Sequence, residues 1–293
     1  MRKIYKSICA ASLAAVMILS GCAPSRPAKV TEFKITSSTA SGNSGDVTLK
    51  KGDTYAVISV RDYGDIKIKL YPDEAPYAVY NFIEIAKTGA YSGRKFHRLV
   101  ENFMIQGGSP NGQGGGGSCI DGGSFKNEIN TSLRHYYGAL CYAANALGDL
   151  SDGFYIVNKK EASDPVTNYN KTYSTCVAQV KSYKQQLESL DPSAANYSTI
   201  MYRGTELYNY SFGSANAIKA MYDTLTDEVT ETYKTKGGVS QIDGMYTVFG
   251  QTVEGFDVID KITAVEKVDS GSGEISTPTS DIIIDKVEIF TME

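Results

Sequence analysis

The segment 64–71 alternates strictly between apolar and charged side chains. Ile66, Ile68 and Leu70 fall on one face of an extended chain, and the residues between them, all charged, fall on the other. A strand with one apolar and one charged face is typical of an antiparallel sheet that has one side in water. The apolar segment 55–60 comes just before it, so we expect the two strands to form a hairpin.

The apolar spacing changes from a period of two to a helical period after Pro76. Proline suits the first turn of a helix, and Gly89 suits its end. A second stretch with helical spacing covers 255–265. Many short strands and two separated helices predict a mainly β architecture with a closed antiparallel barrel. The further strands are predicted at 96–100, 103–107, 138–144, 154–158, 246–249 and 282–290.

Residues 159–236 interrupt this pattern. Apolar side chains recur every three or four residues from Tyr173 to Leu190, which predicts one helix, and again from Ile218 to Val229, which predicts another. A structureless loop of this length is rare inside a compact domain. We therefore predict a helical insertion at 159–236 within a domain that covers 53–293.

The first 21 residues have the features of a signal peptide: basic residues precede the apolar run 8–19, which is too short to span a bilayer. The sequence Leu-Ser-Gly-Cys ending at Cys22 resembles the lipobox of bacterial lipoproteins, and the alternative is an ordinary secretory signal in which this cysteine is incidental. The resemblance implies a lipid anchor at Cys22 on the extracytoplasmic face of a bacterial cell membrane. Residues 22–52, rich in Ser, Thr, Gly, Lys and Pro, are predicted to form a flexible tether.

The formal net charge of −4 argues against a nucleic-acid partner, because phosphate binding needs a basic face. The glycine run 112–117 satisfies G-x-G-x-x-G, but no helical pattern and no lysine in the P-loop position follow it, so we expect no nucleotide. The two histidines, His97 and His135, are not spaced as metal ligands, and we expect no metal or other cofactor. G-x-S-x-G is absent, which leaves a hydrolase without support.

Three cysteines follow Cys22 in the sequence: Cys119, Cys141 and Cys176. Their spacing fits neither a metal site nor a C-x-x-C motif. Cys141 lies in a predicted apolar strand and is expected to be buried as a small hydrophobic residue. A disulfide between Cys119 and Cys176 remains open for a protein outside the cytoplasm.

The segment 96–108 places an arginine and a glutamine beside large apolar side chains on two predicted strands. Its order F-H-R, five residues, then M-I-Q-G-G resembles the signature of the cyclophilins, the prolyl cis/trans isomerases. Three later segments, 138–146, 154–157 and 242–250, resemble the family's G-x-L-S-M-A-x-A strand, its Phe-Tyr strand and its L-D-G-x-x-x-V-F-G segment, in the same order. The resemblance covers 54–158 and 237–290.

This resemblance implies a closed eight-stranded antiparallel cyclophilin-like barrel with two capping helices, interrupted by the helical insertion. It implies isomerisation of X–Pro bonds, whose rotation barrier of about 18–20 kcal/mol comes from amide resonance and needs no nucleophile or cofactor. Arg98 matches the catalytic arginine, whose guanidinium is always charged and has a preorganised fork of donors. The positions that match the substrate site are Phe103, Met104, Gln106, Ala143, Ala144, Tyr155, Ile242 and Tyr246.

The chain departs from the family pattern at three positions. Gly153 replaces a groove glutamine, Tyr246 replaces the usual histidine and Gln241 the frequent tryptophan. The first two departures, at Gly153 and Tyr246, favour a weakened or inactive, peptide-binding module as the alternative function. We expect a monomer that acts on proline-containing exported polypeptides and assists their folding. We also expect the helices of the insertion to wall one side of the groove.

Overall fold

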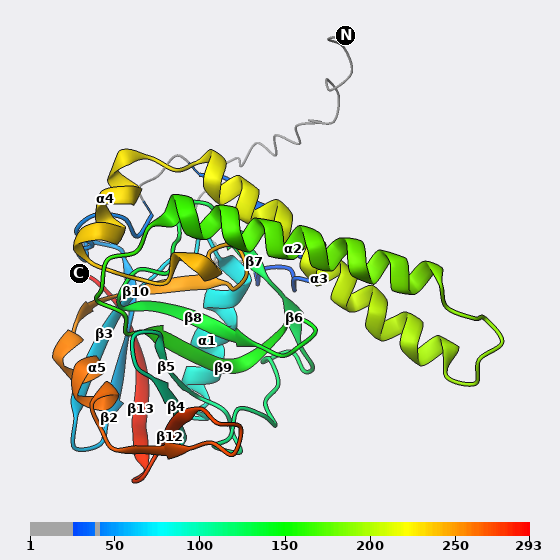
Figure 1. Cartoon of the computed structure of the whole chain (residues 1–293). Coiled ribbons are helices and arrows are strands. Elements are labelled where there is room, and N and C mark those ends of the chain that lie inside the picture. Colours follow the sequence, from blue (N-terminus) through cyan, green and yellow to red (C-terminus); the bar gives the residue numbers. More distant parts are fainter. Residues whose placement is uncertain (1–25, 39–41) are drawn as a thin grey trace.

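The computed structural model describes residues 26–38 and 42–293 (Figure 1). The predicted signal peptide, 1–21, and the predicted lipidation site, Cys22, lie outside the described residues. Among the helices of the described part, none has the length and the apolar character needed to cross a membrane.

The centre of the molecule is a closed antiparallel barrel of eight strands, as predicted. Strand β9 (Asp149–Val157) pairs with β5 (Met104–Gly107) and closes the barrel. The short strand β6 (Phe125–Lys126) extends the sheet beside β9. The order around the barrel is β5 (Met104–Gly107), β4 (Lys95–Val100), β13 (Ile282–Thr291), β2 (Thr54–Val60), β3 (Gly64–Leu70), β10 (Val248–Glu254), β8 (Ala139–Ala144) and β9 (Asp149–Val157).

The alternation of side chains decides which residues fill the barrel. The predicted hairpin of β2 and β3 is confirmed, with Ile58 opposite Ile66. On both strands every second residue is buried in the barrel core, and on β3 the lysines between them face outward, where Lys67 contacts Glu254. This is the pattern that one apolar and one wet face require.

Two helices pack on the barrel at different places, as predicted. Helix α1 (Pro76–Lys87) lies against β13 and β9, and α5 (Phe256–Thr263) lies against β3, β4 and β5. Phe82 of α1 and Ile259 of α5 are fully buried in the barrel core. Both helices therefore contribute to the same core, which is consistent with an amphipathic helix on a sheet.

The insertion consists of three helices: α2 (Pro165–Glu188), α3 (Tyr197–Asp223) and α4 (Asp227–Thr235). The prediction of one helix from Ile218 to Val229 is wrong, because α3 ends at Asp223 and a separate helix, α4, begins at Asp227. Thr226 accepts a hydrogen bond from the backbone N–H of Val229 and so caps α4.

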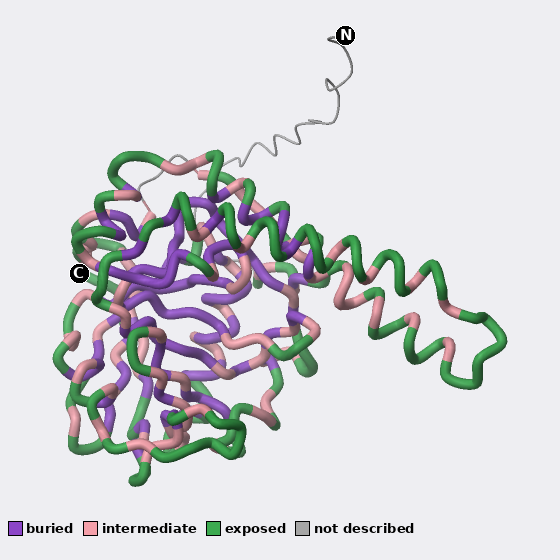
Figure 2. The backbone as a smooth tube through the Cα atoms, viewed as in Figure 1, coloured by how far each residue is buried: buried purple, intermediate pink, exposed green. Residues whose placement is uncertain are grey.

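The outer half of the insertion extends away from the barrel (Figures 1 and 2). We call residues 177–210 the outer arm: all of them are described, and none is buried. The inner half is packed on the domain, where Cys176, Ile218 and Met221 are buried. Cys119 and Cys141 are also buried, and all three cysteines are free thiols, so the Cys119–Cys176 disulfide is not formed.

The described part of the predicted tether, 26–38 and 42–52, differs from the expectation. Strand β1 (Lys34–Thr36) pairs in parallel with β7 (Glu128–Asn130), and Val30 is buried in the barrel core. Asn43 is 2 % exposed, and its side chain bonds the backbone of Arg134. Pairing satisfies the exposed edge of β7, which explains why a polar segment with no periodicity is ordered here.

The remaining elements lie outside the barrel sheet. The 3₁₀ helix η1 (Ser240–Ile242) follows the insertion and leads into β10. Strands β11 (Lys267–Asp269) and β12 (Ile275–Pro278) form a separate hairpin, in which β12 contacts β4.

Candidate active site

A β-bulge in β4 sets the direction of Arg98. Phe96 and Arg98 are two residues apart and would share a face in a regular strand. The register shifts between them, so that Phe96 is fully buried in the barrel core while Arg98 lies opposite Gln106 of β5. The extra residue in the bulge is His97. The bulge therefore turns the arginine to the outer face of the sheet without removing the phenylalanine from the core.

The apolar candidates meet on this same outer face. Ile105 and Ile156 are paired neighbours that point into the barrel core, whereas Met104 and Tyr155, one residue earlier on each strand, belong to a second apolar cluster. Tyr155 meets the ring of Tyr246 edge-on, with 6.1 Å between the centroids. The structure thus brings together the predicted pocket residues Phe103, Met104, Tyr155, Ile242 and Tyr246, with Ala143 beside them.

Arg98 lies at the edge of this cluster. Its guanidinium carbon lies 5.9 Å from the ring centroid of Phe103, and its Nη1 lies 4.0 Å from Sδ of Met104 and 3.4 Å from Oε1 of Gln106. Its Nε and Nη2 each donate to a carboxylate oxygen of Glu274, both at 2.8 Å. One edge of the fork is occupied by Glu274, and the other lies on the side of the apolar cluster.

A hollow bounded by the glycine-rich loop adjoins the cluster. Gln106, Ala143, Ala144 and Gly153 are among the residues that line it. A Cβ added at Gly153 would meet its nearest neighbours at 3.9 Å, an ordinary contact distance. A side chain would therefore fit at this position, where the groove glutamine is absent. Ala144 differs from Ala143, because its side chain packs against the barrel core rather than the second cluster.

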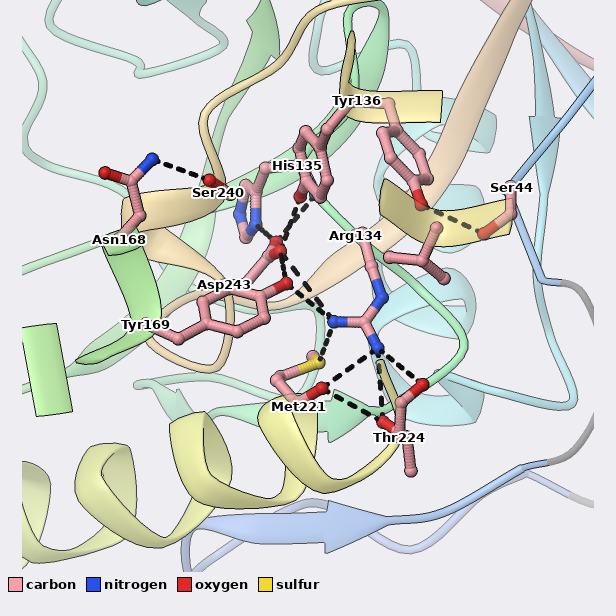
Figure 3. Close-up of polar contacts among 12 residues, drawn as sticks. Ser44, Arg134, His135, Tyr136, Asn168, Tyr169, Met221, Thr224, Ser240 and Asp243 are labelled. Carbon is pink, nitrogen blue, oxygen red and sulfur yellow. Dashed lines mark hydrogen bonds and ion pairs between the residues drawn. The ribbon is translucent and has the colours of Figure 1, made fainter. Parts of the chain in front are cut away.

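A buried polar network lies directly behind the pocket (Figure 3). The Tyr155 hydroxyl and Nε2 of His135 are 3.0 Å apart, and Nδ1 of His135 lies 2.8 Å from Oδ1 of Asp243. Burial raises the pKa of Tyr155 well above its usual range, so its hydroxyl stays protonated. In the neutral imidazole, Nδ1–H donates to Asp243 and Nε2 accepts from Tyr155. The hydroxyl of the pocket residue Tyr155 is therefore fixed by a hydrogen bond to buried His135.

The insertion supplies further partners of Asp243. The hydroxyl groups of Tyr169 on α2 and Tyr233 on α4 both donate to Oδ2 of this carboxylate. Burial acts to raise the pKa of the Asp243 carboxyl, but hydrogen bonding to His135 and the charge of Arg134 outweigh it and hold the pKa below its usual range. Asp243 is therefore a buried carboxylate, and two of its hydrogen-bond donors come from the insertion.

Arg134 connects the same network to α3 (Figure 3). Its Nη1 donates to the Tyr169 hydroxyl at 2.7 Å, and its Nη2 donates to the carbonyl of Met221 at 3.2 Å and to Oγ1 of Thr224 at 3.1 Å. Carbonyl groups at the end of a helix have no partner within the helix, and a cation there is stabilising. Arg134 thus fastens the end of α3 beside Asp243.

The insertion supports the pocket from outside instead of walling the groove. Thr172 donates to the carbonyl of Gln241, and Tyr210 donates to the carbonyl of Met245. Gly244 has φ +79°, and a Cβ there would lie 2.8 Å from the backbone nitrogen of Ile218 in α3. A glycine is required at this close approach. The helices hold the segment 241–246, which carries Ile242 and Tyr246.

The glycine-rich loop has no helix after it in the structure, and β6 is the next element. In the part of the chain that the structure describes, no group of three or more His, Cys, Asp or Glu side chains is arranged to hold a metal ion. The groups that meet at this site are the guanidinium of Arg98, the amide of Gln106 and the apolar cluster.

The model of the family described as "Cyclophilin type peptidyl-prolyl cis-trans isomerase/CLD" matches residues 55–201 and 226–289. The chain belongs to the cyclophilins. The unmatched residues between the two segments, 202–225, lie mainly in α3 of the insertion.

Relatives and a solved structure agree with this cyclophilin assignment. A Staphylococcus haemolyticus protein named for peptidyl-prolyl cis-trans isomerase activity is 29% identical over 226 residues, which cover 77% of this chain and 86% of that protein. A Streptococcus pyogenes protein named for phosphatase and peptidyl-prolyl cis-trans isomerase activities is 32% identical over 231 residues, which are 78% of this chain but only 37% of that protein. The crystal structure of a cyclophilin type isomerase from Cryptosporidium parvum shares the fold, with a TM-score of 0.51, 20% identity and coverage of 82% of this chain and 99% of that chain.

Three parts of the cyclophilin site had no sequence prediction. Asn158, directly after β9, accepts from the backbone N–H of Phe103 at 2.8 Å and donates to the carbonyl of Val100 at 3.0 Å, which fixes the turn before Met104. An asparagine at the end of a predicted strand was the available signal. Glu274 and the partners of Asp243 gave no such signal, because their contacts join separate elements and loops that only the fold brings together.

Proposed function

We propose that this cyclophilin works as a lipid-anchored monomer at the outer face of the membrane. There it isomerises X–Pro bonds of exported proteins and so assists their folding. The support for the location is the signal-like segment 1–21 with its short apolar run and the lipobox-like sequence at Cys22. The support for the substrate is the family, because the protein is a cyclophilin-type peptidyl-prolyl isomerase.

The proposed chemistry is carried by one observation: Arg98 stands opposite Gln106 with Nη1 on the side of the apolar cluster. An N–H donor near the prolyl nitrogen favours the twisted amide, in which that nitrogen has lost its resonance with the carbonyl. Such a donor stabilises the transition state more than either planar isomer, which is the condition for catalysis. No bond to the substrate has to form or break.

The other side chains have positioning roles in this proposal. The proline ring lies in the apolar cluster of Phe103, Met104, Tyr155, Ile242 and Tyr246. Gln106 bonds the substrate backbone, and Ala143 and Ala144 leave room for the chain in the adjoining hollow. Holding one side of the bond while the other rotates needs this combination of a fixed pocket and an open groove.

A second candidate is a peptide-binding module on the same fold, with little or no catalysis. The glycine at position 153 favours it, because no side chain extends from Gly153 to hold the substrate backbone. Binding of a proline peptide without turnover is the behaviour that this alternative predicts.

A proline-isomerisation assay separates the two candidates. The purified protein in detergent is compared with Arg98→Ala, and with Arg98→Lys, which keeps the charge but not the fork. We expect Arg98→Ala to lower kcat/KM about 100-fold, the usual effect of removing one transition-state donor, and Arg98→Lys to recover only part of the loss. A parent protein that binds a proline peptide but has no rate above background supports the alternative. Equal rates for parent and Arg98→Ala contradict the role of Arg98.

The location has its own test. Bacterial cells that express the protein are labelled with a radioactive fatty acid and fractionated. We expect the label and the membrane association to be present in the parent and lost in Cys22→Ala, since the acyl chains supply the anchor. Label that persists in Cys22→Ala contradicts the assignment of the lipidation site.

A further inference from the structure

Glu274 reaches the proposed catalytic arginine from a different part of the chain. It stands 176 residues after Arg98, in the loop between β11 and β12 and directly before β12. Its two oxygens accept separately from Nε and Nη2 of Arg98, each at 2.8 Å, which is the two-point geometry of a strong arginine–carboxylate pair. The two side chains are 36% and 37% exposed, so water reaches the pair.

The turn that carries Glu274 is itself ordered. Oδ1 of Asp269 accepts from the backbone N–H groups of Gly271 and Gly273, at 2.6 and 3.0 Å. The N–H of Ser270 donates to the carbonyl of Glu274 at 2.9 Å. These bonds fix the loop between β11 and β12, so the carboxylate is presented to Arg98 from a rigid turn.

The pair determines which donors of Arg98 remain. A guanidinium has five N–H donors in a planar fork, and Glu274 occupies one on Nε and one on Nη2. Nη1, at the far side of the plane, lies next to Met104 and Gln106. Because the fork is rigid, holding its outer edge fixes the direction of Nη1.

Two effects of Glu274 on Arg98 oppose each other. A nearby carboxylate offsets part of the arginine's charge, but solvent screens a pair that is one-third exposed. A free arginine would lose its orientation among many rotamers, and small displacements from the reactive geometry lower rates strongly. The gain in orientation of the guanidinium therefore outweighs the partial loss of its charge.

We propose that Glu274 is a positioning residue that holds the guanidinium of Arg98 with Nη1 directed at the bound prolyl bond. This inference rests on the catalytic role proposed for Arg98. It also gives the β11–β12 hairpin a function, because that hairpin carries one side of the arginine's environment.

The kinetic test uses the full protein and its variants Glu274→Ala, Glu274→Gln and Asp281→Asn. Asp281 is the charge-matched control: it is 64% exposed and pairs with Lys95 instead of Arg98. We expect Glu274→Ala to lower kcat about tenfold with KM changed less than twofold, because orientation in the transition state is lost. Glu274→Gln, which keeps one acceptor oxygen, should lie between Glu274→Ala and the parent, and Asp281→Asn should equal the parent.

An increase of kcat in Glu274→Ala would mean that the carboxylate restrains the arginine, and would overturn the proposal. An unchanged kcat would overturn it as well. A raised KM with kcat unchanged would assign Glu274 to substrate binding instead of positioning, and would also count against it.

A second readout does not depend on turnover. The ¹⁵N relaxation of the Arg98 Nε–H group reports its motion, with exposed Arg203 of α3 as the internal comparison. We expect an order parameter of about 0.85 in the parent and below about 0.6 in Glu274→Ala. Equal mobility in both proteins overturns the positioning role even if the parent is active. A rigid Arg98 in a parent without turnover leaves Glu274 as its restraint and contradicts the proposed function alone.

Discussion

Arg98 and Arg134 each face a carboxylate, but at different depths in the molecule. Arg98 and Glu274 are both about one-third exposed, at 36% and 37%, and meet directly at 2.8 Å. Arg134 and Asp243 are 1% and 0% exposed, and their nearest charged atoms are 4.0 Å apart, with the Tyr169 hydroxyl bonding both. The exposed pair is simple, whereas the buried pair is surrounded by additional partners.

The difference follows from the cost of burying charge. A charged group away from water must have its donors or acceptors satisfied by the protein, because an unpaired buried charge is strongly destabilising. Arg134 therefore bonds a tyrosine and the end of α3 through Nη1 and Nη2, and its Nε is buried without a hydrogen-bond partner. Arg98 remains partly solvated and keeps Nη1 beside the pocket. The same residue type organises the fold in one place and is available to a substrate in the other.

The largest effect is expected at the buried pair. Asp243→Ala removes the common acceptor of His135, Tyr169 and Tyr233 and leaves Arg134 without a compensating charge. We expect the free energy of unfolding to fall by about 3–5 kcal/mol, as when one partner of a buried ion pair is removed. Urea denaturation followed by circular dichroism measures the change.

The matched control is Arg98→Ala. Because the exposed pair is screened by water, we expect this variant to lose no more than about 1 kcal/mol of stability despite its loss of activity. A stability loss at Arg98 as large as that of Asp243→Ala would remove the distinction between the two sites.

A smaller effect is expected from the tyrosines of the insertion. Tyr169→Phe and Tyr233→Phe each remove one hydroxyl donor to Oδ2 of Asp243, and each should cost about 1–2 kcal/mol. The double variant should lose more than the sum, because the oxygen then has no hydroxyl donor. Tyr202→Phe on the outer arm, at 64% exposed, should have no effect on the unfolding midpoint.

Strictly additive losses would show that the two hydroxyl groups act independently. If neither single variant lost stability, the insertion would be fastened to the domain by its apolar contacts, and the buried network would have little part in holding it.

Most of the barrel could be predicted from the sequence because its signals are local. The alternation in β3, the proline at the start of α1 and the four motifs in order each depend on neighbours in the chain, and family membership confirms the overall assignment. The described part of the 22–52 segment, residues 26–38 and 42–52, could not be judged in this way. Its order comes from pairing with β7 and from Asn43, and composition does not report a distant strand edge that needs a partner.

The site residues also differ in whether local sequence or only the fold reports them. The bulge residue His97 is adjacent to Arg98, and the structure places the predicted apolar side chains in one cluster. The contacts that orient these residues are different, because Glu274 and Asp243 lie in loops without periodicity and reach partners more than 100 residues away. Their roles depend on which loops the closed barrel brings together, and a single sequence does not report that.

The pairing of β1 with β7 also limits how far the domain can stand from a lipid bilayer. Val30, the first residue buried in the barrel core among those that the structure describes, comes eight positions after Cys22. An extended chain covers at most about 3.3–3.6 Å per residue, so a lipid on Cys22 would keep Val30 within about 28 Å of the membrane surface. Under the proposed lipidation, the domain therefore stays close to the membrane surface. Exported polypeptides would then reach its pocket near the place where they emerge from the bilayer.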